Sequence, residues 1–129
     1  YSRAQTHARL VEGISRAARE GEPFGLVRVA LGGLPESGRA RREALEACGA
    51  TLRRSIRRAD IGGRWGADVL VALLPQTGAT SSVVADRLEA TLRAAGEGAG
   101  AALVPVARTL WYPEHGPRVR DLTARLDAP

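Results

Sequence analysis

The sequence predicts an α/β domain in which helices cover a mixed, mainly antiparallel β-sheet. The apolar patterns of its 129 residues alternate in the order helix, strand, helix, strand, strand, helix, strand, helix. Two strand patterns follow each other directly across a short turn at residues 66–68. A hairpin between helices indicates an α/β sandwich and argues against a doubly wound parallel sheet. The length is that of one domain, and neither an internal repeat nor a linker interrupts it.

Residues 2–20 are predicted to form the first helix, because apolar residues recur at helical spacing and Gly21 follows. Its apolar stripe is expected to consist of Leu10, Val11, Ile14 and Ala18. Residues 24–31, FGLVRVAL, are rich in aliphatic residues and predict a strand. Residues 32–38, GGLPESG, predict a loop.

Residues 39–58 predict a second helix that is rich in arginine. Its apolar stripe leaves the arginines outside and consists of Leu45, Cys48, Leu52 and Ile56. Cys48 is the single cysteine, so no internal disulfide is possible. Its place on the stripe predicts a small core residue and not a nucleophile.

The second half begins with a predicted hairpin of residues 61–65 and 69–74. The second of these strands, VLVALL, has no polar alternation, which predicts a central strand buried on both faces. A helix over 80–95, a long strand over 101–112 and a closing helix over 117–126 complete the order.

The positive charge is concentrated in residues 39–64, where eight arginines face three acids, a local excess of +5. The remaining 11 arginines are balanced by 11 acids, so the whole net charge of +5 arises there. Such a local field attracts anions such as phosphates, although an arginine-rich helix is often only a solvated face. The region has neither a helix-turn-helix pattern nor interleaved aromatic residues, so no nucleic-acid partner is expected.

No apolar run approaches the length of a membrane span, and no signal-peptide pattern stands at the start. No insertion of this segment into a membrane is expected, and the single cysteine fits a cytoplasmic location. Because the chain begins at Tyr1, residues 1–129 are expected to be one domain of a larger multidomain protein.

The order and spacing of several short motifs resemble those of a GGDEF domain, the catalytic fold of diguanylate cyclases. The resemblance covers nearly the whole chain: an R-x-x-D motif at Arg57 and Asp60, LLPQT at 73–77, ADRLEATLR at 85–93 and YPEHG at 112–116. The signature five residues of the family correspond to Gly66, Ala67, Asp68, Val69 and Leu70. The resemblance implies a nucleotide-cyclase-like sandwich. Active members of the GGDEF family join two GTP molecules into cyclic di-GMP across a dimer.

The departures from the family imply a degenerate domain that is not an enzyme. Asp68 keeps the position of one metal-binding acid, but the following glutamate is replaced by Val69, and Ala30 stands where the first strand supplies an aspartate. Arg42 falls at the guanine-reading aspartate. Because phosphoryl transfer depends on a Mg²⁺ held by carboxylates, the turn is expected to be a relic that needs no Mg²⁺ or other cofactor and has no catalytic residue.

The R-x-x-D motif is the inhibitory site of the family, and it is intact here. The resemblance implies that Arg57 and Asp60 bind cyclic di-GMP, with Arg87 as a further arginine and Arg58 contributing to the positive field. Arginine can donate two hydrogen bonds to the O6 and N7 edge of guanine, and aspartate can accept from N1 and N2. The resulting hypothesis is a cyclic di-GMP receptor that regulates an attached output or a partner.

Two alternatives stay open. The domain could be a structural or dimerisation module that binds no nucleotide, with a homodimer or a partner protein as its function, and Arg57 and Asp60 would then serve only the turn. Nucleotide binding at the old active site is the second alternative.

Overall fold

The computed structural model describes residues 1–36 and 38–129. Ser37, in the expected loop, lies outside the described residues. The elements are α1 (Arg3–Glu20), β1 (Phe24–Gly32), α2 (Gly38–Ser55), β2 (Ile61–Gly66), β3 (Val69–Pro75), α3 (Ser81–Gly98), β4 (Val104–Tyr112) and α4 (Val119–Asp127). The predicted order of helices and strands is therefore confirmed.

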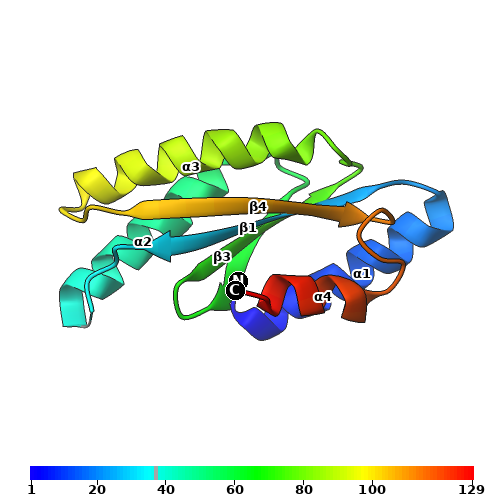
Figure 1. Ribbon diagram of the computed structural model, residues 1–129, viewed down its shortest axis with the longest axis horizontal. Helices are drawn as coiled ribbons and strands as arrows, with labels where there is room; N and C mark the ends of the chain where they lie inside the picture. Colours follow the sequence, from blue (N-terminus) through cyan, green and yellow to red (C-terminus); the bar gives the residue numbers. More distant parts are fainter. Residues whose placement is uncertain (37) are drawn as a thin grey trace.

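The four strands form one sheet in the order β2-β3-β1-β4 (Figure 1). All three pairings are antiparallel, so the predicted mainly antiparallel α/β sandwich is confirmed and the sheet has no parallel pair among the described residues. The edges are β2, which belongs to the hairpin, and β4.

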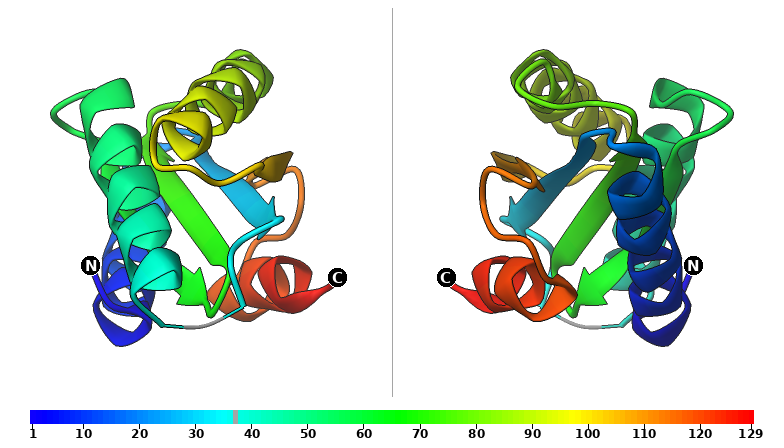
Figure 2. Two further views of the ribbon diagram at one scale, coloured as in Figure 1. Left: turned by 90° about the vertical axis from the view of Figure 1, so that its left-hand side faces the viewer. Right: turned by 90° about the vertical axis from the view of Figure 1, so that its right-hand side faces the viewer.

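Helices cover both faces of the sheet, with α2 and α3 on one side and α1 and α4 on the other (Figure 2). Each face has its own apolar core. The core under α2 and α3 includes Val29, Cys48 and Leu88, and the core under α1 and α4 includes Leu26, Trp65 and Leu122. Residues 69–74 of β3 are buried throughout, as the sequence predicts for a central strand.

Cys48 is fully buried in the first of these cores, which confirms its prediction as a core residue. Burial raises the pKa of its thiol, so the neutral, unreactive form is favoured. This places a chemical reporter at the centre of α2.

The stripe of α1 is shifted from the predicted one. Leu10 and Ile14 are buried as expected, but Val11 is 39% exposed and Ala18 is exposed. The buried side of the helix consists of Thr6, Leu10, Ile14 and Ala17. These residues follow a strict three-to-four-residue spacing, and adjacent Val11 falls on the neighbouring face. The helix begins at a capping box formed by Ser2 and Gln5 and ends at the left-handed Gly21.

The helix predicted over 80–95 continues to Gly98, and the closing helix begins at Val119 and not at 117. Two further predicted boundaries are wrong for identifiable reasons. The second helix ends at Ser55, three residues before the predicted Arg58, because Asp60 bonds to the backbone of Arg57 and closes a turn there. The last strand begins at Val104 and not at 101, because its partner β1 ends at Gly32, which pairs with Val104.

A polar cluster at Trp65 joins the beginning and the end of the chain. The indole Nε1 of Trp65 donates to Asp127 Oδ1 at 2.8 Å, and the guanidinium of Arg3 donates to the same oxygen at 3.0 Å. Arg3 also donates to the Trp65 carbonyl at 2.7 Å and lies 4.2 Å from the ring centroid. The start of α1 and the end of α4 are thus fixed to the hairpin. None of the helices in the described part of the chain is both long and apolar enough to cross a membrane.

Candidate ligand-binding site

The signature turn joins β2 and β3 at the end of the hairpin and lies against the end of β1. Val69 pairs directly with Ala30 of β1, and the Leu31 amide donates to the Asp68 carbonyl at 2.8 Å. Ala30, which the family resemblance places at the aspartate of the first strand, therefore lies beside the signature turn. The two side chains that face each other across the strands there are both apolar, and Asp68 is the exposed acid next to them.

Arginines surround this turn. Arg41 of α2 donates to the Ala67 carbonyl at 3.1 Å and to the Pro35 carbonyl at 3.1 Å, and Arg64 of β2 donates to the Ala67 carbonyl at 3.4 Å. Guanidinium groups beside a single carboxylate disfavour a divalent cation electrostatically. No group of three or more potential metal ligands occurs within residues 1–36 and 38–129. The two guanidinium groups give the surroundings of the turn a positive field that attracts anions.

The R-x-x-D motif forms a compact turn between α2 and β2. The Arg57 backbone amide donates to Asp60 Oδ2 at 2.8 Å, and the Arg57 side chain donates to both carboxylate oxygens, with Nη2 2.8 Å from Oδ1. The same Nη2 reaches the Pro75 carbonyl at 2.9 Å and Thr77 Oγ1 at 3.0 Å. Arg57 therefore fastens the end of α2 to the end of β3.

The two residues of the motif differ sharply in exposure. The Asp60 side chain is 3% exposed, whereas that of Arg57 is 59% exposed. The hydrogen bonds to Asp60 raise the pKa of the Arg57 guanidinium above its ordinary value. Among the described residues Asp60 accepts only from Arg57, so it holds the guanidinium in place. The guanidinium is the part of the motif that solvent reaches.

Arg87 and Arg58 complete the expected set. Arg87 extends from α3 and donates to the Ser55 carbonyl at 2.7 Å, at the last residue of α2. The structure therefore brings Arg87 to the chain segment that leads into Arg57. Arg58 is exposed, and its side chain makes neither a hydrogen bond nor an ion pair within the described part of the chain.

Sequence reasoning missed Thr77 and the Pro75 carbonyl as partners of Arg57. Thr77 is 9% exposed, and its hydroxyl also donates to the Pro75 carbonyl at 3.1 Å. The LLPQT motif ends at this threonine, but its contact with Arg57 depends on the pairing of β2 with β3 and has no local signal. The sequence placed Arg57 and Asp60 at a helix end, whereas they lie in the turn that follows the helix.

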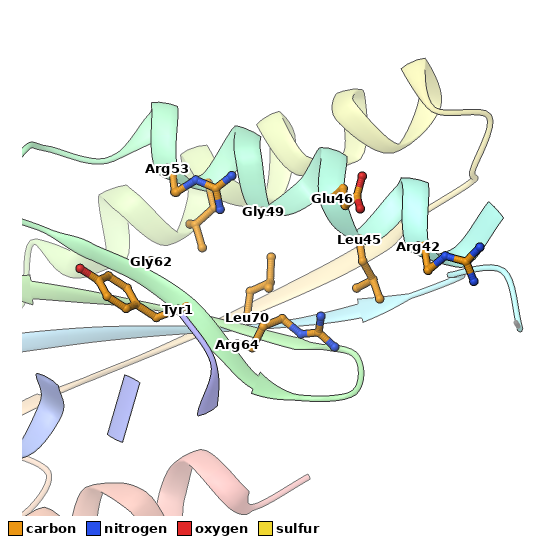
Figure 3. A pocket seen from close by; sticks show the side chains of 11 residues that line it. Tyr1, Arg42, Leu45, Glu46, Gly49, Arg53, Gly62, Arg64 and Leu70 are labelled. Atoms are coloured by element: carbon orange, nitrogen blue, oxygen red, sulfur yellow. The ribbon is translucent and has the colours of Figure 1, made fainter. Parts of the chain in front are cut away.

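A groove with a volume of about 410 Å³ runs between α2 and the edge strand β2; we call it the α2–β2 groove (Figure 3). Its charged lining residues are Arg42, Glu46, Arg53 and Arg64. Leu45, Leu52 and Leu70 supply the apolar part of the lining. Arg42, which falls at the guanine-reading position of the family, thus faces this groove with donors only.

The comparison with solved structures identifies the fold, whereas comparisons of the sequence find no match. No protein-family model matches the sequence, and no curated protein matches it. Among solved structures, a sensory box/GGDEF family protein from Caulobacter crescentus superposes with a TM-score of 0.83 at 21% identity, over 98% of this chain and 87% of that one. The chain has the fold of a GGDEF domain.

Two further solved structures have the same fold. The active GGEEF domain of a diguanylate cyclase from Vibrio cholerae has a TM-score of 0.75 at 15% identity and covers 85% of this chain and 75% of that chain. The GGDEF domain of DgcB from Caulobacter crescentus, in complex with c-di-GMP, has a TM-score of 0.72 at 13% identity, over 98% and 78% of the two chains. The GGDEF fold therefore occurs both in an active cyclase and in a complex with the cyclase product.

Proposed function

We propose that this domain is a catalytically inactive GGDEF domain that binds cyclic di-GMP at the Arg57–Asp60 turn and so regulates an attached output domain or a partner. A cytoplasmic location and a place within a larger bacterial protein are part of the proposal. The observation that carries it is the guanidinium of Arg57, which Asp60 holds from its buried side while 59% of the Arg57 side chain stays exposed.

The chemistry of this guanidinium suits guanine and phosphate. Arg57 uses Nε and Nη2 for Asp60, Pro75 and Thr77, and Nη1 makes no hydrogen bond within the described residues. The exposed edge and face can donate to guanine O6 and N7 or stack on a base. Arg58 and Arg87 add positive charge on either side of the α2 terminus, which favours the phosphates.

Asp60 has a more specific role in this proposal than reading guanine. Because its carboxylate is engaged by Arg57, direct contact with guanine N1 and N2 would require the pair to open. We assign Asp60 the positioning of Arg57, which reduces the side-chain entropy that Arg57 loses when a ligand binds.

The absence of catalysis rests on the signature turn. Ala30 opposite Val69 leaves Asp68 without a second carboxylate, and Arg41 and Arg64 contribute positive charge beside it. We propose that the domain neither uses Mg²⁺ nor converts GTP.

Calorimetric titration of the domain with cyclic di-GMP, GTP and GMP tests the proposal. Saturable binding of cyclic di-GMP, with GTP at least tenfold weaker, is expected. Equal binding of GTP, or formation of cyclic di-GMP from GTP and Mg²⁺ above the buffer blank, would contradict the proposed receptor.

A structural or dimerisation module is the second candidate, and the burial of Asp60 favours it. A carboxylate that is 3% exposed and bonded to a backbone amide has a sufficient structural reason to be present without any ligand. Under this alternative the domain binds no nucleotide, and substitution of Asp60 changes only stability.

A further inference from the structure

We propose that the α2–β2 groove binds an acidic peptide segment of a partner protein in an extended conformation. This inference does not rest on the proposed function, because the groove lies along the body of α2 whereas Arg57 follows its C-terminal end. The groove combines three arginines with an apolar wall, and its volume of about 410 Å³ falls in the range of ligand-binding sites.

The arginines of the groove have spare donors. Within the described residues, Arg42 and Arg53 make neither a hydrogen bond nor an ion pair, and Arg64 donates only to the Gly66 and Ala67 carbonyls at 3.5 and 3.4 Å. Glu46 is the one acid in the lining, against the three arginines. The groove therefore presents a net positive lining to a ligand.

The spacing of the arginines selects a long anion. Arg42 and Arg53 stand at the two ends of the groove on α2 (Figure 3), and 11 residues of helix span about 16 Å. A small dicarboxylate or a single phosphate cannot reach both. In an extended peptide, side chains at alternate positions point to one side about 7 Å apart, so three alternating acids span about 13 Å.

The apolar lining favours a peptide over a single-stranded nucleic acid. Leu45 points from α2 toward the hairpin (Figure 3), where it can contact apolar side chains of a bound segment. Tyr1 is the single aromatic residue of the lining, so the successive stacking platforms typical of single-strand binding are missing from the groove.

Gly49 keeps the groove open. A Cβ placed at Gly49 would meet only the Arg53 guanidinium, at 3.5 Å, so a larger side chain can enter the groove without a backbone clash. Leucine also favours helix over glycine. Gly49→Leu is therefore expected to fold, to retain every charge and to block the groove.

The test is fluorescence anisotropy with a fluorescein-labelled ten-residue peptide in which aspartate occupies alternate positions and leucine and serine the others. Its controls are the same peptide with asparagine for aspartate, an eight-residue oligothymidylate and free citrate. The aspartate peptide should bind at least tenfold more tightly than the asparagine peptide, and neither citrate nor the oligonucleotide should match it at equal charge concentration.

Variants locate the site. Arg42→Ala, Arg53→Ala and Arg64→Ala should each weaken binding about three- to fivefold, as expected for a partly exposed ion pair, and the triple variant about thirtyfold or more. The control Arg93→Ala removes an exposed arginine on α3 outside the groove and should change affinity less than twofold. Gly49→Leu should weaken binding at least tenfold, and Gly49→Ala much less.

Four results would overturn the proposal. The first two are an unchanged affinity for the aspartate peptide in a folded Gly49→Leu variant, and an equal loss of affinity in Arg93→Ala and in the groove variants. The other two are tighter binding of the oligonucleotide than of the aspartate peptide, and full displacement of that peptide by citrate with the same affinity. If Gly49→Leu does not fold, the comparison of the triple variant with Arg93→Ala decides alone.

Discussion

The signature turn at 66–70 and the Arg57–Asp60 turn flank the same strand, β2, and they differ in the polar side-chain contacts that they contain. At the signature turn the side chains that face each other are Ala30 and Val69, and Asp68 stands alone at the surface. At the other turn a buried carboxylate is held by a backbone amide and a guanidinium. The signature turn is held by its backbone, so its stability does not depend on a carboxylate, whereas the Arg57–Asp60 turn depends on the buried carboxylate of Asp60.

An R-x-x-D motif can be present for a structural role or for ligand binding, and its two residues differ in this respect. Asp60 has a structural reason to be present, and Arg57 has both a structural partner and an exposed donor. Ligand binding and stability must therefore be measured separately at these two residues.

The largest expected effect is on cyclic di-GMP affinity when Arg57 is changed. Arg57→Ala removes charged hydrogen bonds to the ligand, each contributing roughly 1.5–3 kcal/mol, so calorimetry should show a loss of about tenfold to more than a hundredfold. Arg57→Lys should bind nearly as weakly, because lysine keeps the charge and lacks the planar fork. Parent-like binding by the lysine variant would mean that the positive face attracts anions only diffusely.

The next effect is on the free energy of unfolding. Asp60→Ala leaves the Arg57 amide and guanidinium without their acceptor, which costs about 1–3 kcal/mol. Denaturant unfolding followed by circular dichroism measures it, with Asp86→Ala as a control at an exposed acid on α3. Equal stability of Asp60→Ala and the parent would show that the bonds from Arg57 to the buried Asp60 carboxylate do not hold the turn.

A smaller effect is expected on the rate at which Cys48 is labelled. Cys48 lies on α2, the helix that leads into the Arg57–Asp60 turn. Its thiol is fully buried, so labelling by a thiol reagent reports the opening of α2. Asp60→Ala should accelerate labelling at least about fivefold, the equivalent of 1 kcal/mol, and Asp68→Ala should leave it unchanged. Acceleration by Asp68→Ala would place the signature turn within the same cooperative unit.

The smallest effect is expected at Asp68 itself. Because no ligand contact is assigned to it, Asp68→Ala should leave cyclic di-GMP affinity within about threefold, less than one charged hydrogen bond. A tenfold loss in calorimetry would mean that the old turn takes part in binding.

The sequence was sufficient for the elements, the buried central strand and the position of Ala30 beside the turn, since these depend on local periodicity and on motif spacing. It was insufficient where the outcome depends on partners distant in the chain. It was also insufficient at the end of α2, where the apolar stripe continues to Ile56 but the bond from Arg57 to nearby Asp60 ends the helix first. Leu103 is buried and was predicted to belong to the last strand. No residue of β1 pairs with it, so the strand begins one residue later, at Val104.

The same limit applies to the site. The three-residue spacing of Arg57 and Asp60 predicts that they are neighbours. The contact of Arg57 with Thr77 depends on the register of the predicted hairpin, which brings the two ends of the hairpin together and which the sequence does not display. The α2–β2 groove likewise arises from two elements that meet only in the folded chain. Arg42 stood out in the sequence by its position in the family motif, whereas Arg53 and Arg64 were visible only as part of a concentration of charge.

The bond from Arg3 to Asp127 has a kinetic consequence, since it joins residues 124 positions apart. Nearly the whole chain must be ordered before this contact and the neighbouring bond from Trp65 to Asp127 can form, so both are expected to be absent from the transition state for folding. Contacts that form only after the transition state slow unfolding and have little effect on the folding rate. Asp127→Asn should accordingly raise the unfolding rate in stopped-flow experiments and leave the folding rate almost unchanged.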